Sequence, residues 1–335
     1  LRMDEAFTRN VTAWQKLPAR PARTAPFPPG LHPALAAALL RRGIPALYVH
    51  QARAVQAALA GENVTVVTGT ASGKTLCYAL PALHAALTDP QARALFLFPT
   101  KALAQDQEAA LVALAAEVEE KEGGGWRVEG GGRKMEEFGQ RPAASRQQLI
   151  SIRTYDGDTP PARRAAIRKE AQLLLSNPDM LHAGILPRHP QWAAFFSGLR
   201  LVVIDELHAC TGVFGSHVAN VLRRLRRICR FYGSEPQFIL TSATIANPRE
   251  LAEKLIEAPV TLIPPDLDGS PRAEKTVILY NPPVVDALLG VRRAYTLESK
   301  DIAAEFLRGE AQTVLFARAR QTVELLLGYL RDEVR

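Results

Sequence analysis

Two groups of residues in this sequence have the types and spacing that nucleotide chemistry requires, and the first is TGTASGKT at residues 68–75. It follows the pattern G-x-x-x-x-G-K-[ST], except that Thr68 replaces the first glycine. In such a loop, backbone N–H groups surround the phosphates, the lysine contacts them and the Ser/Thr hydroxyl binds Mg²⁺. The candidate phosphate-binding residues are Thr68, Gly69, Thr70, Ala71, Ser72, Gly73, Lys74 and Thr75. The alternative interpretation is a Gly- and Ser-rich turn that only resembles this loop.

The second group is the pair of carboxylates in VVIDELH, at residues 202–208. Hydrolysis of ATP needs one carboxylate for the metal and one to activate the attacking water. We expect Asp205, together with Thr75, to hold Mg²⁺, and Glu206 to orient and deprotonate the water. With Lys74, these residues predict an ATP site.

Short apolar runs must position both groups. They occupy residues 63–69, 94–100, 149–156, 171–177, 199–206 and 237–244. Their apolar character is continuous and does not alternate, which is typical of strands buried on both faces of a mostly parallel sheet. The polar residues of interest fall where these strands end, and the carboxyl ends of parallel strands share one edge of a sheet. The sequence therefore predicts an α/β fold with its site at that edge.

Composition narrows the class of protein. A chain of 335 residues is long enough for one large domain and part of another. The formal charge of +7 favours a polyanionic partner such as nucleic acid. The three cysteines are too far apart for a disulfide framework or a four-cysteine zinc site, which fits a reducing cytoplasm. No apolar run is long enough to span a membrane, and the first residues lack the apolar core of a signal sequence.

Changes in composition suggest where domains begin and end. We expect residues 1–33 to form an extended, proline-rich lead-in and residues 34–263 to form the first domain. Residues 117–148 contain two GGG runs and predict a flexible insertion. We expect a linker at 264–274 and the start of a second domain at 275–335, with strands over 276–283 and 312–320.

Several segments together resemble one family. TGTASGKT, PTKALAQDQ at 99–107, DELH at 205–208 and TSAT at 241–244 resemble motifs I, Ia, II and III of superfamily 2 helicases of the DEAD/DEAH type. LYVHQARAV, TYDGDTP, SNPDMLH and GVFGSHVANVLRRL resemble the bacterial mitomycin repair factor A type, over almost the whole chain from about residue 11. The resemblance implies a RecA-like P-loop NTPase domain with a mostly parallel sheet, and a partial second RecA-like domain. Leu207 departs from the alanine of strict DEAH.

The resemblance also assigns roles to residues outside the two groups. It implies that Gln51 contacts adenine, where the alternative is a surface helix glutamine. It implies that Thr100, Lys101 and Asn177 contact the nucleic-acid backbone. The alternatives are a solvated loop lysine at Lys101 and a turn before Pro178 that uses the Asn177 side chain.

A third implied role is coupling between the ATP site and motif III. His208 would make this coupling through Ser242 and Thr244, and the alternative is a histidine that only packs. Asp156 and Asp158 are acidic, so we interpret them as turn or cap residues. The arginines within 217–232, HVANVLRRLRRICRFY, lie opposite an apolar helix face and would either contact phosphates or remain solvated.

The sequence thus predicts an ATP- and Mg²⁺-dependent helicase or translocase, and the resemblance favours single-stranded or partly duplex DNA and a role in repair. The resemblance places an arginine finger in motif VI, and Arg318 and Arg320 lie too early in the chain to serve. We therefore expect a fragment, without the rest of the second domain and the zinc region, that binds ATP but unwinds poorly or not at all. Alternatives are an RNA helicase and a nucleic-acid-binding P-loop module without turnover. A GTPase is disfavoured because TKAL has Leu103 where the guanine-reading Asp is required.

Overall fold

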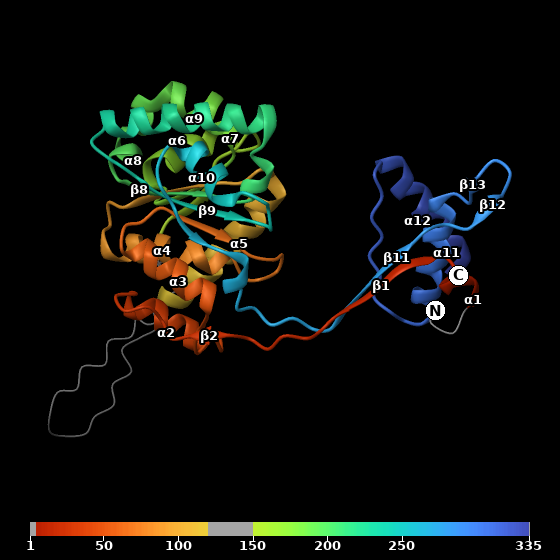
Figure 1. Cartoon of the computed structure of the whole chain (residues 1–335). Coiled ribbons are helices and arrows are strands. Elements are labelled where there is room, and N and C mark those ends of the chain that lie inside the picture. Colours follow the sequence, from red (N-terminus) through yellow and green to blue (C-terminus); the bar gives the residue numbers. More distant parts are fainter. Residues whose placement is uncertain (1–4, 120–149, 335) are drawn as a thin grey trace, which may run out of the picture. The chain divides into compact units, whose positions relative to one another are not determined.

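The computed structural model describes residues 5–119 and 150–334, which form two compact units. The larger unit comprises residues 21–271, and the smaller combines residues 1–20 with residues 272–335. Figure 1 shows the helices and strands of both units.

The larger unit is built on a parallel sheet of seven strands in the order β10-β4-β9-β8-β5-β7-β6. The strands are β4 (Val64–Val67), β5 (Arg93–Leu97), β6 (Ile152–Thr154), β7 (Leu173–Ser176), β8 (Leu199–Ile204), β9 (Gln237–Ser242) and β10 (Thr261–Ile263). The first six coincide with the six predicted apolar runs. Because all seven run in parallel, their carboxyl ends form one edge, as the sequence predicted.

Helices cover both faces of this sheet (Figure 1). One face carries α2 (Pro33–Arg41), α3 (Val49–Leu59), α4 (Thr75–Thr88) and α5 (Lys101–Glu119). The other carries α6 (Pro161–Glu170), α7 (Pro178–Met180), α8 (Ala193–Ser197), α9 (Gly212–Phe231) and α10 (Pro248–Ile256). The π-helix η2 (Leu181–Ile185), the 3-10 helices η3 (Leu186–Trp192), η4 (Leu207–Ala209) and η5 (Pro265–Leu267), and the two-residue strands β2 (Thr24–Ala25) and β3 (Leu47–Tyr48) complete this unit.

Two hydrophobic cores fill the spaces between the sheet and its helices. Strand β5 contributes to both, since Ala94 and Phe96 lie in one core while Leu95 and Leu97 lie in the other. Side chains alternate between the faces of a strand, so a strand buried on both faces must be apolar throughout. This is the physical reason for the continuous apolar runs in the sequence.

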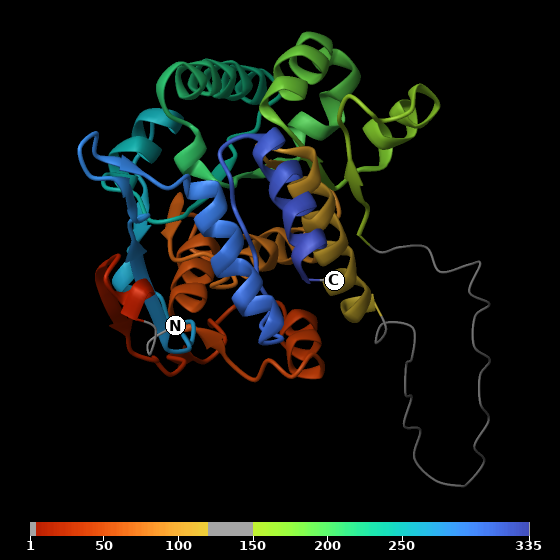
Figure 2. The same cartoon turned by 90° about the vertical axis from the view of Figure 1, so that its right-hand side faces the viewer.

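The smaller unit pairs the two ends of the chain. β1 (Val11–Leu17) and β11 (Lys275–Tyr280) form an antiparallel ribbon, and Phe7 of α1 (Glu5–Thr8) stacks on Tyr280. A second ribbon joins β12 (Val284–Asp286) to β13 (Val291–Arg292). Helices α11 (Tyr295–Arg308) and α12 (Arg320–Val334) lie side by side (Figures 1 and 2).

The structure divides the chain at other points than the sequence suggested. We expected residues 1–33 to form a lead-in, whereas residues 1–20 join the smaller unit because β1 pairs with β11. Residues 264–271, expected to belong to a linker at 264–274, pack on the larger unit through buried Asp268 and Ser270. From residue 120 on, the insertion expected at 117–148 lies outside the described residues.

The strand predicted over 276–283 is present as β11, but the strand predicted over 312–320 was wrong. Residues 312–319 have no regular structure, and Arg320 begins α12. Val314 and Phe316 are exposed. A strand is stabilised by a neighbouring strand, and none of the described residues pairs with this segment. In residues 5–119 and 150–334 we find no helix with the length and apolarity that a membrane span requires.

Candidate active site

The sequence TGTASGKT forms a loop between a buried strand and a helix. β4 is buried along its whole length and ends at Val67, and α4 begins at Thr75 with Lys74 at its N-cap. The loop turns through two left-handed residues, Ala71 (φ 58°) and Gly73 (φ 79°). The N-terminus of α4 therefore directly follows the loop, and a loop that leads into a helix N-terminus is the arrangement that binds phosphate.

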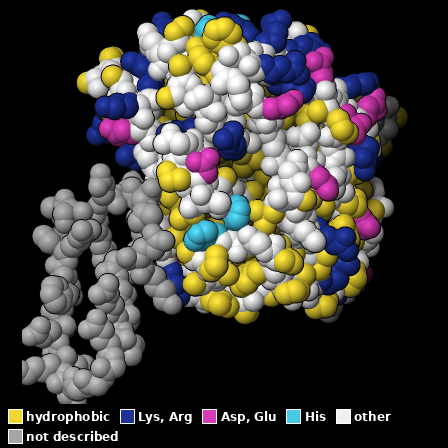
Figure 3. All heavy atoms as spheres, turned by 90° about the vertical axis from the view of Figure 1, so that its left-hand side faces the viewer, with side chains coloured by type: hydrophobic (Ala, Val, Ile, Leu, Met, Phe, Trp, Pro, Cys, Tyr) yellow, Lys and Arg dark blue, Asp and Glu magenta, His cyan; other side chains and the backbone are white. Residues whose placement is uncertain are grey.

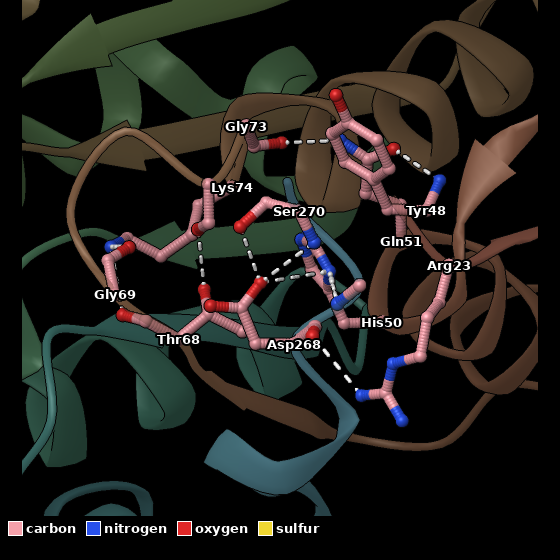
Figure 4. Close-up of polar contacts among 12 residues, drawn as sticks. Arg23, Tyr48, His50, Gln51, Thr68, Gly69, Gly73, Lys74, Asp268 and Ser270 are labelled. Atoms are coloured by element: carbon pink, nitrogen blue, oxygen red, sulfur yellow. Dashed lines mark hydrogen bonds and ion pairs between the residues drawn. The ribbon is translucent and has the colours of Figure 1, made fainter. Parts of the chain in front are cut away.

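The loop is held closed by its own residues (Figure 4). The hydroxyl groups of Thr68 and Ser72 are 2.7 Å apart, and both side chains are buried. The Lys74 ammonium donates to the carbonyls of Thr68 at 3.3 Å and Gly69 at 3.1 Å. Thr70 is exposed. The ammonium thus lies above the loop, where phosphate oxygens would replace the two carbonyls as its partners.

Gln51 lies against this loop with its amide fixed in one orientation (Figure 4). Its Oε1 accepts from the Tyr48 N–H at 2.9 Å, and its Nε2 donates to the Gly73 carbonyl at 2.9 Å. The residue is 3% exposed, so it is not the surface glutamine that the alternative interpretation required. One N–H and one lone pair of the amide remain for a further partner.

Asp205 and Glu206 follow β8, at the same edge of the sheet as the loop. Asp205 is buried, and its Oδ1 accepts from the Glu206 N–H at 2.8 Å and from the hydroxyl of Thr241. Glu206 has a left-handed backbone, with φ 56°. Such strain in a non-glycine residue is typical of functional sites, and here it directs two successive carboxylates differently.

The hydroxyl of Thr75 is held by a glutamine of the PTKALAQDQ segment. Gln107 Oε1 accepts from Thr75 Oγ1 at 3.0 Å and from the Tyr78 hydroxyl at 2.9 Å. Burial and the charge of Asp205 raise the pKa of Tyr78 well above its usual range, so Tyr78 remains a donor. The first turns of α4 are thereby linked to α5.

His208 contacts both Glu206 and motif III. Its Nδ1 lies 3.1 Å from Glu206 Oε2, 3.5 Å from Ser242 Oγ and 3.4 Å from the Ala243 nitrogen. Nδ1 of a histidine either carries a proton and donates or lacks one and accepts. The contact with Glu206 is the shortest of the three, so we infer that Nδ1 is protonated and donates to Glu206. Thr244 is exposed, and within the described residues its side chain makes no hydrogen bond to His208, so the structure brings only Ser242 to this histidine.

The three candidate nucleic-acid residues lie at the ends of neighbouring strands. Thr100 and Lys101 follow β5, and Asn177 follows β7. Thr100 Oγ1 accepts from the Leu103 N–H at 3.3 Å, and Asn177 Oδ1 accepts from the Met180 N–H at 2.8 Å, so both side chains cap helices. The capping contact of Asn177 is the turn that the alternative interpretation described, and it leaves the amide nitrogen to donate elsewhere.

Lys101 is exposed and pairs with Asp158 at 2.6 Å, and this hydrogen bond raises the pKa of the lysine. Asp156 Oδ1 accepts from the Asp158 N–H at 2.9 Å, which is the turn role predicted for Asp156. Lys101 therefore remains charged at neutral pH. A phosphate that binds Lys101 would have to replace Asp158 as its partner.

The residues at the sheet edge suit Mg²⁺. Thr75 and Asp205 offer a hydroxyl and a carboxylate, which are the hard oxygen ligands that Mg²⁺ prefers. Both oxygens are already oriented, by Gln107 and by Thr241. Within the described residues no cluster of three or more His, Cys, Asp or Glu could hold a metal without further ligands, so phosphate or water oxygens would have to complete this site.

A sequence model of the DEAD/DEAH box helicases matches residues 48–251, which include the loop, both carboxylates and the TSAT segment. The chain belongs to this family. The family members are ATP-dependent helicases, and the parallel sheet of the larger unit is that of a RecA-like helicase domain. The resemblance found in the sequence is thereby confirmed.

Individual DEAD/DEAH box helicases are similar over almost the whole chain. The uncharacterized ATP-dependent helicase YprA of Bacillus subtilis (strain 168) is 46% identical over 97% of this chain and 40% of its own length. The ATP-dependent helicase HRQ1 of Saccharomyces cerevisiae is 38% identical over 85% of this chain and 24% of its own length. This chain therefore spans less than half the length of the curated relatives it matches.

A solved structure has a similar fold. The crystal structure of the DUF1998 helicase MrfA bound to DNA and AMPPNP has a TM-score of 0.84 and 46% identity, over 97% of this chain and 41% of that chain. This agrees with the mitomycin repair factor A type that the sequence resembles.

Two residues of this helicase site were missed by sequence reasoning. Gln107 and Thr241 lie inside the PTKALAQDQ and TSAT segments, but neither is charged and neither has a spacing that indicates its partner. The signal that would have found Thr241 is its register in the sheet. Leu240 pairs with Ile204 in the parallel ladder of β9 and β8, so the next residues along, Thr241 and Asp205, lie opposite each other.

Proposed function

We propose that this chain carries the first ATP-binding domain of a DNA helicase or translocase and that it uses ATP with Mg²⁺. The observation that carries the proposal is that the loop at Thr68–Thr75 and the carboxylates Asp205 and Glu206 follow strands of one parallel sheet and so lie at the same edge of it. A phosphate-binding loop used only for structure would not need a second, strained carboxylate oriented by a histidine.

In this proposal each residue has one task. Lys74 and the N–H groups of the loop bind the phosphates, and Gln51 reads adenine with its remaining donor and acceptor. Glu206 orients the attacking water and accepts its proton, while His208 holds Glu206 through the 3.1 Å contact. Thr75 and Asp205 would hold Mg²⁺, which supplies positive charge to the transferring phosphate when bound.

We place the nucleic acid at the ends of β5 and β7, where Thr100, Lys101 and Asn177 offer a hydroxyl, an ammonium and an amide. DNA is favoured because MrfA, at 46% identity, is bound to DNA in its crystal structure. We further propose that the DNA is single-stranded or partly duplex, as the resemblance in the sequence implies. Residues 272–335 would begin a second RecA-like domain, and the arginine finger would come from such a domain. Because this chain spans less than half the length of the curated helicases it matches, we expect residues 1–335 alone to bind ATP and to unwind DNA poorly or not at all.

The test compares ATP hydrolysis with and without single-stranded DNA or RNA. A motor hydrolyses ATP faster when its strand is present, and it responds more to the strand on which it acts. Glu206→Gln should bind ATP as the unchanged chain does and lose at least about 100-fold in hydrolysis, since a general base contributes about 10²–10⁴-fold. Glu235→Gln, at an exposed position away from the site, is the matched control.

ATP binding with no stimulation by either nucleic acid would favour the module without turnover. Stimulation by RNA alone would favour the RNA helicase. Loss of activity in Glu235→Gln to the same extent as in Glu206→Gln would remove the assignment of Glu206.

A further inference from the structure

A groove lies between α9 and the segment that follows Asn177. Its volume is about 600 Å³, and Pro178, His182, Phe214 and His217 are among the residues that line it. Grooves of about 300–1,000 Å³ accommodate small-molecule ligands, so this one is large enough for a single nucleotide. Neither the nucleotide site nor the contacts proposed for Thr100 and Lys101 use it.

The wall that α9 contributes is positively charged. Between Gly212 and Phe231 the helix has five arginines and no acidic residue. Figure 3, which views the left-hand side of Figure 1, shows Lys and Arg side chains along its upper edge, where Figure 1 places α9. The acidic residue among the lining side chains is Asp179, against three arginines. The groove therefore favours an anionic ligand.

Four of the five arginines of α9 divide into two kinds. Arg223 donates to Glu257 at 2.7 Å, and Arg226 donates to the Ile256 carbonyl at 2.5 Å, so these two attach α9 to the end of α10. Arg224 and Arg227 line the groove, and neither forms an ion pair with another described residue. Two guanidinium groups of the groove are thus available for a ligand.

An aromatic side chain lies in the same groove. Phe214 is 39% exposed although it is large and apolar. Aromatic side chains beside a basic groove are the usual means by which proteins bind single strands, because every base has a face that stacks. Arginine adds bidentate contacts to phosphate.

The position of the groove connects it to the proposed path of the strand. Pro178, on the groove wall, directly follows Asn177, a proposed backbone contact. A nucleic-acid strand that contacts the Asn177 amide therefore lies beside Pro178, on the wall of the groove.

We propose that this groove is a nucleotide subsite for single-stranded nucleic acid, which extends the strand path beyond Asn177. Phe214 stacks on a base, and Arg224 and Arg227 bind the adjacent phosphates. The inference rests on the proposed function, because it assumes that a strand lies at Asn177.

The test measures binding of oligothymidylates of about 5 and about 15 nucleotides, which span the usual site sizes, over a range of salt concentrations. The variant Arg224→Ala/Arg227→Ala leaves Arg223 and Arg226 in place, so that α10 remains attached. Arg230→Ala is the matched control, because Arg230 is an exposed arginine of the same helix outside the groove. Thermal unfolding and ATP binding should be unchanged in both.

For the longer strand, the slope of log K against log salt should decrease in magnitude by about 1.4 in the double variant, at about 0.7 for each lost phosphate contact. Phe214→Ala should weaken binding about fivefold or more, whereas Val213→Ala, at the exposed neighbour, should not. Equal slopes and affinities in the double variant and in Arg230→Ala would overturn the groove proposal. Failure of the unchanged chain to bind either strand would instead overturn the proposed function.

Discussion

The contact between Gln51 and the phosphate-binding loop can be tested by adding one methyl group at Gly73. A Cβ at this position would lie 2.7 Å from Gln51 Nε2, closer than real Cβ atoms approach a neighbour. The same atom donates to the Gly73 carbonyl at 2.9 Å. Gly73→Ala therefore forces the amide of Gln51 out of the position from which we propose it reads adenine.

The cost has two parts that can be separated. Gly73 has φ 79°, and a left-handed backbone costs a non-glycine residue about 1–2 kcal/mol. Displacing Gln51 also loses a hydrogen bond of about 1 kcal/mol. Gly73→Ala should thus lower the free energy of unfolding of the larger unit by about 2–3 kcal/mol. Gly61→Ala, with φ 84° and nothing within 4 Å of its Cβ, should cost only the first part.

Guanidinium chloride unfolding followed by circular dichroism gives the two stabilities, and titration with ATP and GTP gives the selectivity. We expect Gly73→Ala to bind ATP about 10-fold more weakly and to lose preference for ATP over GTP, since about 1.4 kcal/mol corresponds to 10-fold. Gly61→Ala should keep both. In a Gln51→Ala background, Gly73→Ala should have little further effect on selectivity. Unchanged ATP preference in Gly73→Ala would refute the proposed role of Gln51.

Three further predictions follow from buried contacts of the same unit. Thr241→Val removes a hydrogen bond to the Asp205 carboxylate, so it should lower the free energy of unfolding in urea by about 1.5–3 kcal/mol. Thr65→Val is the control, because the buried Thr65 hydroxyl has no hydrogen-bond partner within the described residues, and it should leave the free energy of unfolding unchanged. Gln107→Leu removes the acceptor of Thr75 and should raise the Mg²⁺ concentration needed for ATP binding about 10-fold, while unchanged Mg²⁺ dependence would contradict this role. Burial raises the pKa of Cys77 to about 12 and of Cys210 and Cys229 to about 11, so a disulfide reagent at pH 8 should modify the three thiols only after unfolding; rapid modification of the native chain would contradict their burial.

The sheet of the larger unit was predictable because strands that are buried on both faces have continuous apolar sequences. Leu173, Leu174 and Leu175 of β7 are all fully buried, and three successive apolar residues are typical of a strand that is covered on both faces. The run at 312–320 has a similar apolar pattern but forms no strand, and Phe316 is 90% exposed. A strand forms only where a neighbouring strand is available to pair with it. Hydrophobicity alone does not indicate whether such a neighbour is present.

The long-range pairing of the smaller unit was not predictable for a related reason. Val11–Leu17 pairs with Lys275–Tyr280, at the opposite end of the sequence. In β11 only Ile278 and Tyr280 are partly buried, and the other four residues are exposed. The sequence of this strand therefore contains no strong pattern of burial from which a partner could be predicted. The local sequence indicates which strands are buried. The strand that pairs with a half-exposed strand is set by the fold of the rest of the chain, so the local sequence does not predict it.

The candidate site shows the same division between what is local and what is not. The loop, Asp205 and Glu206 were recognised because their chemistry depends on types and spacing within a few residues. The contacts of Gln107 with Thr75 and of Thr241 with Asp205 join residues 32 and 36 positions apart, and they exist only once the strands are ordered. Neutral residues that orient catalytic ones have no local signature, since a Gln or Thr at that place serves equally well as a core or surface residue.

The substitution of Thr68 for the first glycine of the loop has a structural reason. The left-handed positions of the loop are Ala71 and Gly73, so the first position does not need glycine's conformational freedom. Thr68 instead closes the loop through its contact with Ser72, and its carbonyl, with that of Gly69, holds the Lys74 ammonium. Binding of phosphate is therefore an exchange, in which Lys74 gives up two neutral carbonyls for anionic oxygens. Because a cationic ammonium attracts an anionic oxygen more strongly than it attracts a neutral carbonyl, the exchange favours the nucleotide, while the Thr68–Ser72 contact keeps the loop in shape.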